Sequence, residues 1–157
     1  MTHDEPLREL LGHLLEWEAA HVGFDKAVAY CRPALRGKRP AGLPHSPWEL
    51  LEHIRRAQRD ILDFCTDPDY REKEWPKDFW PPAPAPPSDA AWDASIEAFR
   101  KDRERLAALA RDGDLTAPIP HGDGATLLVE LVLAADHAAY HVGQLVLVRR
   151  ALGDWTS

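Results

Sequence analysis

The chain has 157 residues, a hydrophobic fraction of 45% and a formal net charge of -7 at pH 7. This size and composition fit one ordinary domain with a substantial core, so we expect a single domain over residues 1–157. The acidic balance argues against a partner such as nucleic acid or an anionic membrane surface, because both require a concentrated basic patch.

The N-terminal sequence and the cysteines predict a cytoplasmic protein. No N-terminal stretch combines a basic start with an apolar run of signal-peptide length, and no uninterrupted apolar segment approaches the roughly 20 residues that cross a bilayer. Cys31 and Cys65 lie far apart and form no CxxC pair, so we expect two reduced thiols. We therefore expect no membrane partner.

Residues 4–31 predict the first helix. Their apolar residues recur at three- and four-residue spacing, and His21 occupies one position of this row. A histidine in such a row either donates to a buried acceptor or faces a polar pocket, and both interpretations stay open. His21 is therefore a candidate catalytic base. Residues 32–45 hold three prolines and two glycines, which end this helix.

The second helix has a well-marked start. Ser46 is a capping residue, Pro47 fits the first helical position, and Glu49 can reach back to the cap. His53 leans toward the core row of this helix. Asp60 lies two turns further along the same edge, where it could orient a ligand or act as a base, although an ion pair with an arginine or a surface position is the favoured interpretation.

A proline-rich loop follows the second helix. Residues 66–87 hold seven prolines, which exclude a continuous helix, together with the aromatic residues Tyr70, Trp75, Phe79 and Trp80. Four aromatic side chains would be poorly solvated in a disordered linker, so we expect the loop to pack across the other helices. Trp75 and Trp80 are candidate cofactor-binding residues that roof a pocket; packing without ligand contact is the alternative.

The third helix is predicted to begin at Ser88 or Asp89 and to end at Gly113. A fourth helix follows over residues 126–152. It is apolar around most of its circumference, so we expect it to lie inside a bundle. Its core row includes His141, and His137 lies one turn earlier. Gln144, one turn after His141, could contact a ligand or merely pack between helices.

Four helical patterns without an alternating strand pattern predict an all-α four-helix bundle. His53 from the second helix and His137 and His141 from the fourth then supply three imidazoles to one divalent metal ion. Nitrogen ligands suit zinc or nickel, and iron, manganese and copper are also compatible. The glutamate of an HExxH peptidase is absent, because Ala138 and Ala139 lie between the two histidines of the last helix.

The stretches SPWELLEH and DHAAYHVGQL resemble the histidine triad of the DinB/YfiT-like superfamily of metal-binding four-helix bundles. The resemblance covers nearly the whole chain and implies that His53, His137 and His141 are the metal ligands. It also implies a homodimer. Because the superfamily includes transferases that use bacillithiol or mycothiol, along with isomerase-like and amidase-like relatives, a low-molecular-weight thiol is an implied cofactor.

Two functional hypotheses follow. In the first, the chain is an enzyme whose metal ion keeps open coordination positions and activates a small thiol or water, for transfer or hydrolysis on a small molecule. In the second, the chain is a non-catalytic metal-binding stress-response bundle, in which the ion joins the second helix to the fourth. A third interpretation satisfies the histidines without metal. The substrate, the reaction and the native metal are not predicted.

Overall fold

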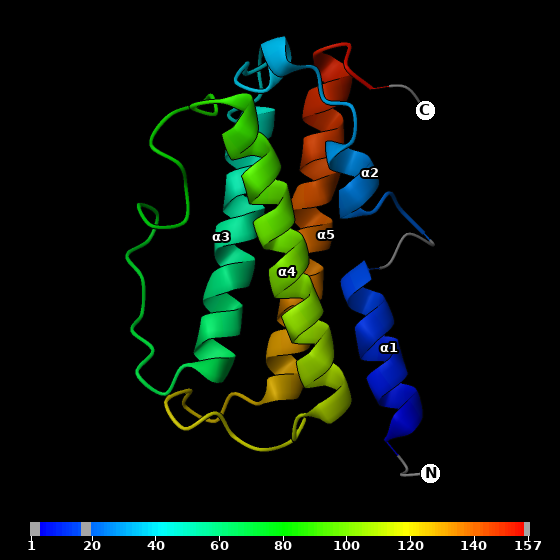
Figure 1. The fold of residues 1–157 in the computed structure, drawn as a ribbon, viewed down its shortest axis with the longest axis vertical. Coiled ribbons are helices and arrows are strands. Elements are labelled where there is room, and N and C mark those ends of the chain that lie inside the picture. Colours follow the sequence, from blue (N-terminus) through cyan, green and yellow to red (C-terminus); the bar gives the residue numbers. More distant parts are fainter. Residues whose placement is uncertain (1–3, 17–19, 156–157) are drawn as a thin grey trace.

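The computed structural model describes residues 4–16 and 20–155 (Figure 1). Within that part of the chain the fold is helical, as predicted. The elements are α1 (Glu5–Glu16), α2 (Phe24–Val28), the 3₁₀ helix η1 (Pro33–Leu35), α3 (Pro47–Thr66), α4 (Asp89–Asp112) and α5 (Leu127–Ala151).

Helices α1, α3, α4 and α5 form the predicted four-helix bundle. Figure 1 shows that α3 and α4 run in one direction, whereas α1 and α5 run in the opposite direction. The two parallel helices require a long connection, and residues 67–88 supply it by returning along the outside of α3. Helix α3 packs on both α4 and α5, which makes it central to the bundle.

The prediction of one helix over residues 4–31 is wrong. Residues 20–23 are not helical, Gly23 caps the N-terminus of the separate short helix α2, and α2 ends at Val28. The β-branched Val22 and Gly23 are poor helix formers. The break also lets Leu15 and Phe24 enter different parts of the core.

The core consists of two clusters of buried apolar side chains stacked along the bundle. One cluster contains Trp92 and Phe99 of α4, and the ring of Phe24 stacks on Phe99 with centroids 3.8 Å apart. The other contains Leu62 and Leu106. Both clusters receive side chains from α3, α4 and α5, so these three helices are fixed to one another along their length.

The starts of α3 and α4 are as predicted. Ser46 accepts a hydrogen bond from the Glu49 amide, and the Glu49 side chain accepts one from the Ser46 amide, which completes a capping box. The side chain of Ser88 caps α4, and Gly113 follows its last turn. The first turn of α3 is thereby well ordered, and it leads directly to His53.

Helix α5 is only partly enclosed, which corrects the prediction that it lies inside the bundle. Leu131 and Leu145 are buried in the core, whereas Leu133, Tyr140 and Leu147 are exposed. Contrary to the sequence-based expectation, α5 is also long and apolar enough to cross a membrane by length and composition alone. In this fold it packs against α1, α2, α3 and α4, as the core helix of a bundle does.

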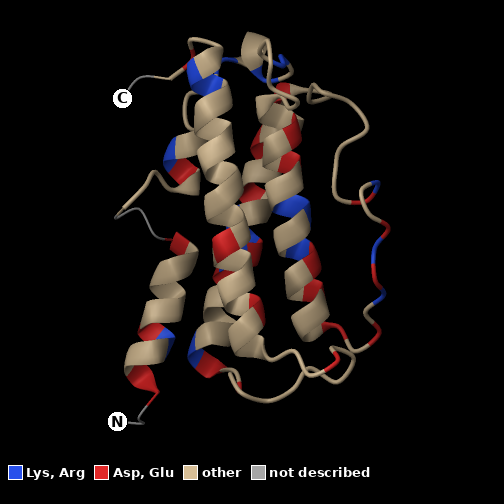
Figure 2. Ribbon diagram, turned by 180° about the vertical axis from the view of Figure 1, so that it is seen from behind, with Lys and Arg blue, Asp and Glu red and all other residues tan. Residues whose placement is uncertain are grey.

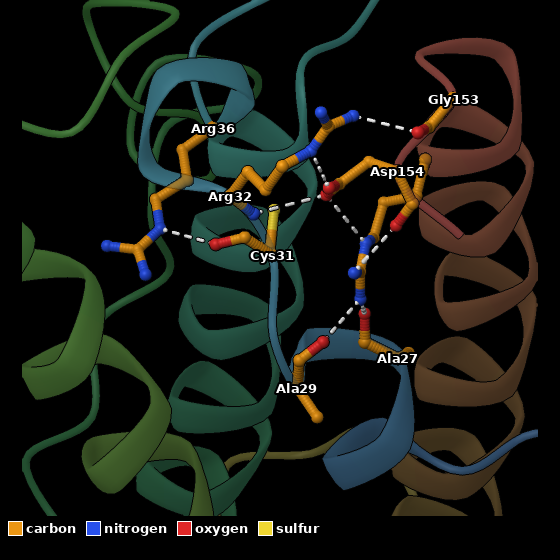
Figure 3. Close-up of polar contacts among 8 residues, drawn as sticks. Ala27, Ala29, Cys31, Arg32, Arg36, Gly153 and Asp154 are labelled. Atoms are coloured by element: carbon orange, nitrogen blue, oxygen red, sulfur yellow. Dashed lines mark hydrogen bonds and ion pairs between the residues drawn. The ribbon is translucent and has the colours of Figure 1, made fainter. Parts of the chain in front are cut away.

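A polar clamp joins the end of α5 to α2 (Figure 3). The buried guanidinium of Arg149 donates to the carbonyls of Ala27 and Ala29 at 2.7 and 2.9 Å. It also pairs with the buried carboxylate of Asp154, which accepts a 2.7 Å hydrogen bond from Arg32. The clamp fixes the C-terminal end of α5, the helix that carries His137 and His141.

The two cysteines are free thiols, as expected. Burial raises the pKa of Cys31 to about 12 and that of Cys65 to about 12. Because the thiolate is the reactive form, neither side chain is suited to act as a nucleophile near neutral pH.

Charged residues are distributed over several elements of the molecule. Figure 2 shows Lys and Arg interspersed with Asp and Glu on the helices and along the connection between α3 and α4. Several of these charges are paired, including Arg59 with Asp63 on α3 and Arg100 with Asp25 between α4 and α2. Mixed charge of this kind is typical of a solvated surface.

Candidate metal site

The structure brings the three predicted histidines together. His53 comes from α3, and His137 and His141 lie one turn apart on α5. Ligand nitrogens from all three lie within 4.8 Å of one another. The Nε2 atom of His53 is 3.1 Å from Nε2 of His141 and 3.2 Å from Nε2 of His137.

Hydrogen bonds on the far side of two rings determine which nitrogen carries the proton. Nδ1 of His53 donates to the carbonyl of Phe79 at 3.1 Å, and Nδ1 of His141 donates to the side-chain oxygen of Gln144 at 2.7 Å. Because these oxygens can only accept, a neutral ring must leave Nε2 bare in both cases. The two Nε2 lone pairs therefore face each other at 3.1 Å, an unfavourable contact that a cation between them would make favourable.

All three rings favour the neutral form that a metal ligand requires. Burial lowers the pKa of His53 to about 4 and that of His137 to about 4, and it also lowers the pKa of His141. The proximity of the rings to one another adds to the effect at His53 and His137. At neutral pH the cluster consequently presents nitrogen lone pairs without having to release protons.

The spacing of the nitrogens fits a single divalent ion. Bonds of about 2.05 Å in a tetrahedral site place neighbouring nitrogens about 3.3 Å apart, and an octahedral site brings them slightly closer. The observed Nε2 separations of 3.1 and 3.2 Å agree with this range. Three ligands from the protein leave at least one coordination position for a small molecule.

The loop between α3 and α4 packs on α3, as predicted, and lies against this cluster. The ring of Trp80 stacks on His53 with centroids 4.0 Å apart and planes at 3°. The Phe79 carbonyl accepts from His53. Arg56 of α3 donates to the backbone carbonyls of Asp78 and Trp80, so hydrogen bonds from two residues of α3 hold the loop in place. The ring of Trp75 lies 6.1 Å from that of His53 and is 66% exposed, so it forms the outer edge of the cover.

Gln144 supports the cluster from α5 by accepting from His141. The sequence left open whether Gln144 makes a functional hydrogen bond or only packs between helices. The structure favours the hydrogen bond, because Gln144 contacts the candidate metal ligand His141. Residues at i and i+3 of a helix face each other, which explains how Gln144 reaches this ring.

The two candidate bases do not join the cluster. Asp60 accepts from the Tyr70 hydroxyl at 3.1 Å and pairs with Lys73 at 3.1 Å, so the favoured ion-pair interpretation is confirmed, with a lysine where an arginine was expected. Burial and the neighbouring Asp60 carboxylate raise the pKa of Tyr70 to about 12. This polar group lies about two helical turns, roughly 10 Å, from His53 along α3.

His21 lies beside a different face of α5 from the face that carries the histidine cluster. Its ring is exposed, its Nδ1 lies 3.0 Å from the Val22 carbonyl, and it borders a surface pocket with Ala135 and Ala139. Residues two apart on a helix do not share a face, so the side of α5 that carries Ala135 and Ala139 differs from the side that carries His137. The structure thus places His21 in a pocket, as one interpretation proposed, but away from the histidine cluster.

Sequence reasoning missed His45. Its ring stacks on Trp80 with centroids 4.2 Å apart, on the opposite face from His53. His45 precedes the cap of α3 in an irregular segment, where no helical period connects it to other residues. The role of Arg56 was also missed, because its contacts are to backbone atoms of a loop whose path the sequence does not define.

Comparison with known proteins gives a family for the chain. Residues 16–145 match the family model of the DinB superfamily, and this range includes all three histidines of the cluster. No curated protein and no solved structure matches the chain.

Proposed function

This chain belongs to the DinB superfamily, and we propose that it is a metal-dependent enzyme acting on a small molecule. His53, His137 and His141 would hold one divalent ion, and a thiol or water at an open coordination position would be activated for transfer or hydrolysis. The proposal is supported chiefly by the pair of bare Nε2 atoms that face each other at 3.1 Å in a three-nitrogen site. Such incomplete protein ligation is typical of catalytic metal sites.

A divalent ion bound there would lower the pKa of water or of a thiol toward neutral pH. The surrounding residues prepare the site for it. The Phe79 carbonyl and Gln144 hold the rings of His53 and His141 in the tautomer that directs Nε2 inward. Trp80 excludes water from the face of His53 on which it stacks. Asp60 and His21 lie outside the site, so neither is retained as the base.

We propose zinc or nickel as the metal, because three imidazole nitrogens suit both ions. If the reaction uses a thiol, it comes from a separate low-molecular-weight cofactor. Burial raises the pKa of both Cys31 and Cys65 to about 12, which leaves the chain without a ready thiolate of its own. A low-molecular-weight thiol pool and reduced cysteines are consistent with the proposed cytoplasmic location.

The experimental test is a turnover screen of zinc-loaded and nickel-loaded protein. Bacillithiol, mycothiol and glutathione serve as thiols with monochlorobimane as the acceptor, and 4-nitrophenyl acetate reports hydrolysis. We expect a metal-dependent rate above that of the uncatalysed reaction. In His53→Ala this rate should fall to that of the uncatalysed reaction, while helical circular dichroism stays unchanged. Stoichiometric metal with no turnover in any of these assays would contradict the proposal as stated.

The alternative is a non-catalytic bundle in which the ion is structural. It is supported by the location of His53, which is 2% exposed, lies beneath Trp80 and joins α3 to α5 through the cluster. Under this alternative chelation causes a large fall in melting temperature, because the free energy of metal binding then adds to that of folding. An apo protein as stable as the metal-loaded protein would exclude it.

A further inference from the structure

A second pocket lies beside the histidine cluster, separated from it by one aromatic ring. It has a volume of about 720 Å³ and is bordered by residues of the 39–49 segment, by Arg56 of α3 and by the 76–82 part of the loop. One face of the Trp80 ring stacks on His53, and the other face stacks on His45, which lines this pocket. The volume is within the range of small-molecule sites.

The walls of the pocket are mainly apolar and rigid. Four prolines contribute ring carbons, Pro44, Pro76, Pro81 and Pro82, and Trp80 contributes the edge of its ring, because His53 and His45 cover its two faces. Proline has a restricted backbone and few side-chain conformers, so such walls lose little entropy when a ligand binds. Surfaces of this type suit a flat or aromatic ligand body.

The basic side chains of the pocket retain unused hydrogen-bond donors. Arg39 donates to Glu49 through Nε and Nη2, and its Nη1 has no partner among the residues that the structure describes. Arg56 donates through Nε and Nη1 to Glu52 and to the loop carbonyls, which leaves its Nη2 without a partner within the same described ranges. Lys77 lies at the rim, where its ammonium pairs with the exposed carboxylate of Glu74 at 3.0 Å and keeps further N–H donors.

Of the two acidic side chains of the pocket, Glu49 is engaged through both carboxylate oxygens and Asp78 through one. Both carboxylate oxygens of Glu49 accept from Arg39, and one of them also accepts from the Ser46 amide. One carboxylate oxygen of Asp78 accepts from the Glu74 amide at 2.8 Å. The pocket therefore offers more unused donors than acceptors, which favours an anionic group on the ligand.

We propose that this pocket binds a small organic anion with an aromatic or otherwise apolar body, such as an arylcarboxylate. The carboxylate interacts with Arg39, Arg56 and Lys77, and the body lies along the prolines, His45 and the edge of the Trp80 ring. The pocket also holds the substrate of the proposed metal-dependent reaction, a step that rests on the proposed function. In that arrangement the reacting end of the substrate passes the edge of Trp80 to reach the histidine cluster.

Binding is tested by nuclear magnetic resonance on the full chain labelled with ¹⁵N. The indole N–H signal of Trp80, assigned by its absence in Trp80→Phe, is followed during titration with 2-naphthoate. The neutral 2-naphthamide has the same aromatic body and serves as the matched ligand. We expect 2-naphthoate to shift the Trp80 signal in a saturable manner. We expect the affinity for 2-naphthamide to be lower by at least about fivefold, because it loses a charged hydrogen bond.

A charge reversal at the rim tests the location. Lys77 is exposed and pairs only with exposed Glu74 among the described residues, so Lys77→Glu should fold normally. We expect it to weaken 2-naphthoate about fivefold. Lys101→Glu, which makes the same change on the exposed surface of α4, should leave the affinity unchanged. No shift of the Trp80 signal, or equal affinity in both variants, would overturn the proposal.

Metal content of the same samples separates this inference from the proposed function. Saturable binding of 2-naphthoate in protein that never retains metal would support the pocket and remove its link to a metal-dependent reaction. Stoichiometric metal with no response of Trp80 to 2-naphthoate would leave the metal site intact and overturn the pocket proposal.

Discussion

At the scale of single residues, the site depends on which nitrogen of each ring is free. Gln144 and the Phe79 carbonyl accept hydrogen bonds from the Nδ1–H groups of His141 and His53, and both Nε2 atoms then point to one place. Burial alone would make an unpaired imidazole costly. The two acceptors thus offset part of the cost of keeping the rings out of water, and they orient the rings for a metal ion.

Removing the acceptor of His141 should weaken metal binding. In Gln144→Leu the His141 ring loses its 2.7 Å hydrogen bond and with it a fixed tautomer and orientation. We expect zinc affinity to fall roughly 10- to 100-fold, measured by competition with a chromogenic chelator. Gln144→Glu keeps an acceptor and should retain most of the affinity. Equal affinity in Gln144→Leu and wild type would show that the hydrogen bond plays no part.

The histidine cluster should make the metal-free protein sensitive to mild acid. Its folded-state pKa values of about 4 at His53 and His137 lie below the ordinary value of 6.5, so the unfolded chain binds more protons in this interval. The free energy of unfolding should therefore decrease as pH falls from about 6.5 to about 4. Urea unfolding of the metal-free protein, measured across this pH range, tests the expected decrease in the free energy of unfolding.

The matched control for that pH dependence is His137→Gln, which removes one of the titrating rings. Its free energy of unfolding should depend less steeply on pH than that of the wild-type metal-free protein between about 4 and 6.5. Parallel profiles for the two proteins would contradict the assignment of this acid sensitivity to the buried rings.

The three histidines could be predicted because they occupy positions in regular helices. Spacing of i and i+4 pairs His137 with His141, and the row of α3 places His53 toward the core. His45 gives no such signal, because it lies in an irregular segment and meets Trp80 only through the path of a loop. His21 also lies in an irregular segment: the break before α2 removes it from the predicted helical row, although it still borders a pocket.

At the scale of elements, the connection between α3 and α4 does more than join two helices. Hydrogen bonds from His53 and Arg56 hold its backbone against α3, and Trp80 lies flat on His53. Its proline content predicted an irregular path, and its aromatic residues predicted packing. The specific stack of Trp80 could not be predicted, since it depends on where an irregular backbone turns.

Removing the Trp80 ring should expose the metal site. We expect zinc to leave Trp80→Ala about fivefold faster than wild type when chelator is in excess, because the indole stacked on His53 contributes about 1 kcal/mol. Trp75→Ala is the matched control, since that ring is 66% exposed and lies further from His53. The same increase in both variants would indicate general loosening of the loop instead of a specific cover.

At the scale of the whole molecule, the predicted bundle is confirmed and its connectivity is a new finding. Capping residues Ser46, Ser88 and Thr126 mark the starts of α3, α4 and α5, and the first two starts were predicted from Ser46 and from Ser88 or Asp89. The parallel course of α3 and α4 was not predicted, because the length of a loop does not tell whether it turns back or crosses over. That crossover runs along the outside of α3 (Figure 1), and it brings Trp80 to its stack on His53.

The exposed apolar side of α5 supports the expected homodimer. Leu133, Tyr140 and Leu147 are 46%, 65% and 53% exposed and recur every seventh residue, so they form one row along the helix. We propose that a second copy of the chain covers this row. Light scattering should give twice the chain mass of 17.6 kDa for wild type and a single chain mass for Leu133→Glu.

A matched variant distinguishes loss of the interface from a general effect of the introduced charge. Leu10 on α1 is 45% exposed, close to the value for Leu133, and lies on a different helix. Leu10→Glu should therefore remain dimeric with unchanged helical circular dichroism. A monomeric wild type, or a dimer that persists in Leu133→Glu, would show that this row is not the interface.

The most direct measurement of the central claim is metal content per chain. Protein purified without chelator or a histidine tag is analysed by elemental mass spectrometry, with wild type and His137→Ala prepared side by side. Because His137 is one of three clustered ligands, we predict close to one zinc or nickel ion per wild-type chain and none in the variant. Background metal in both proteins would contradict the metal site and the proposed function that depends on it.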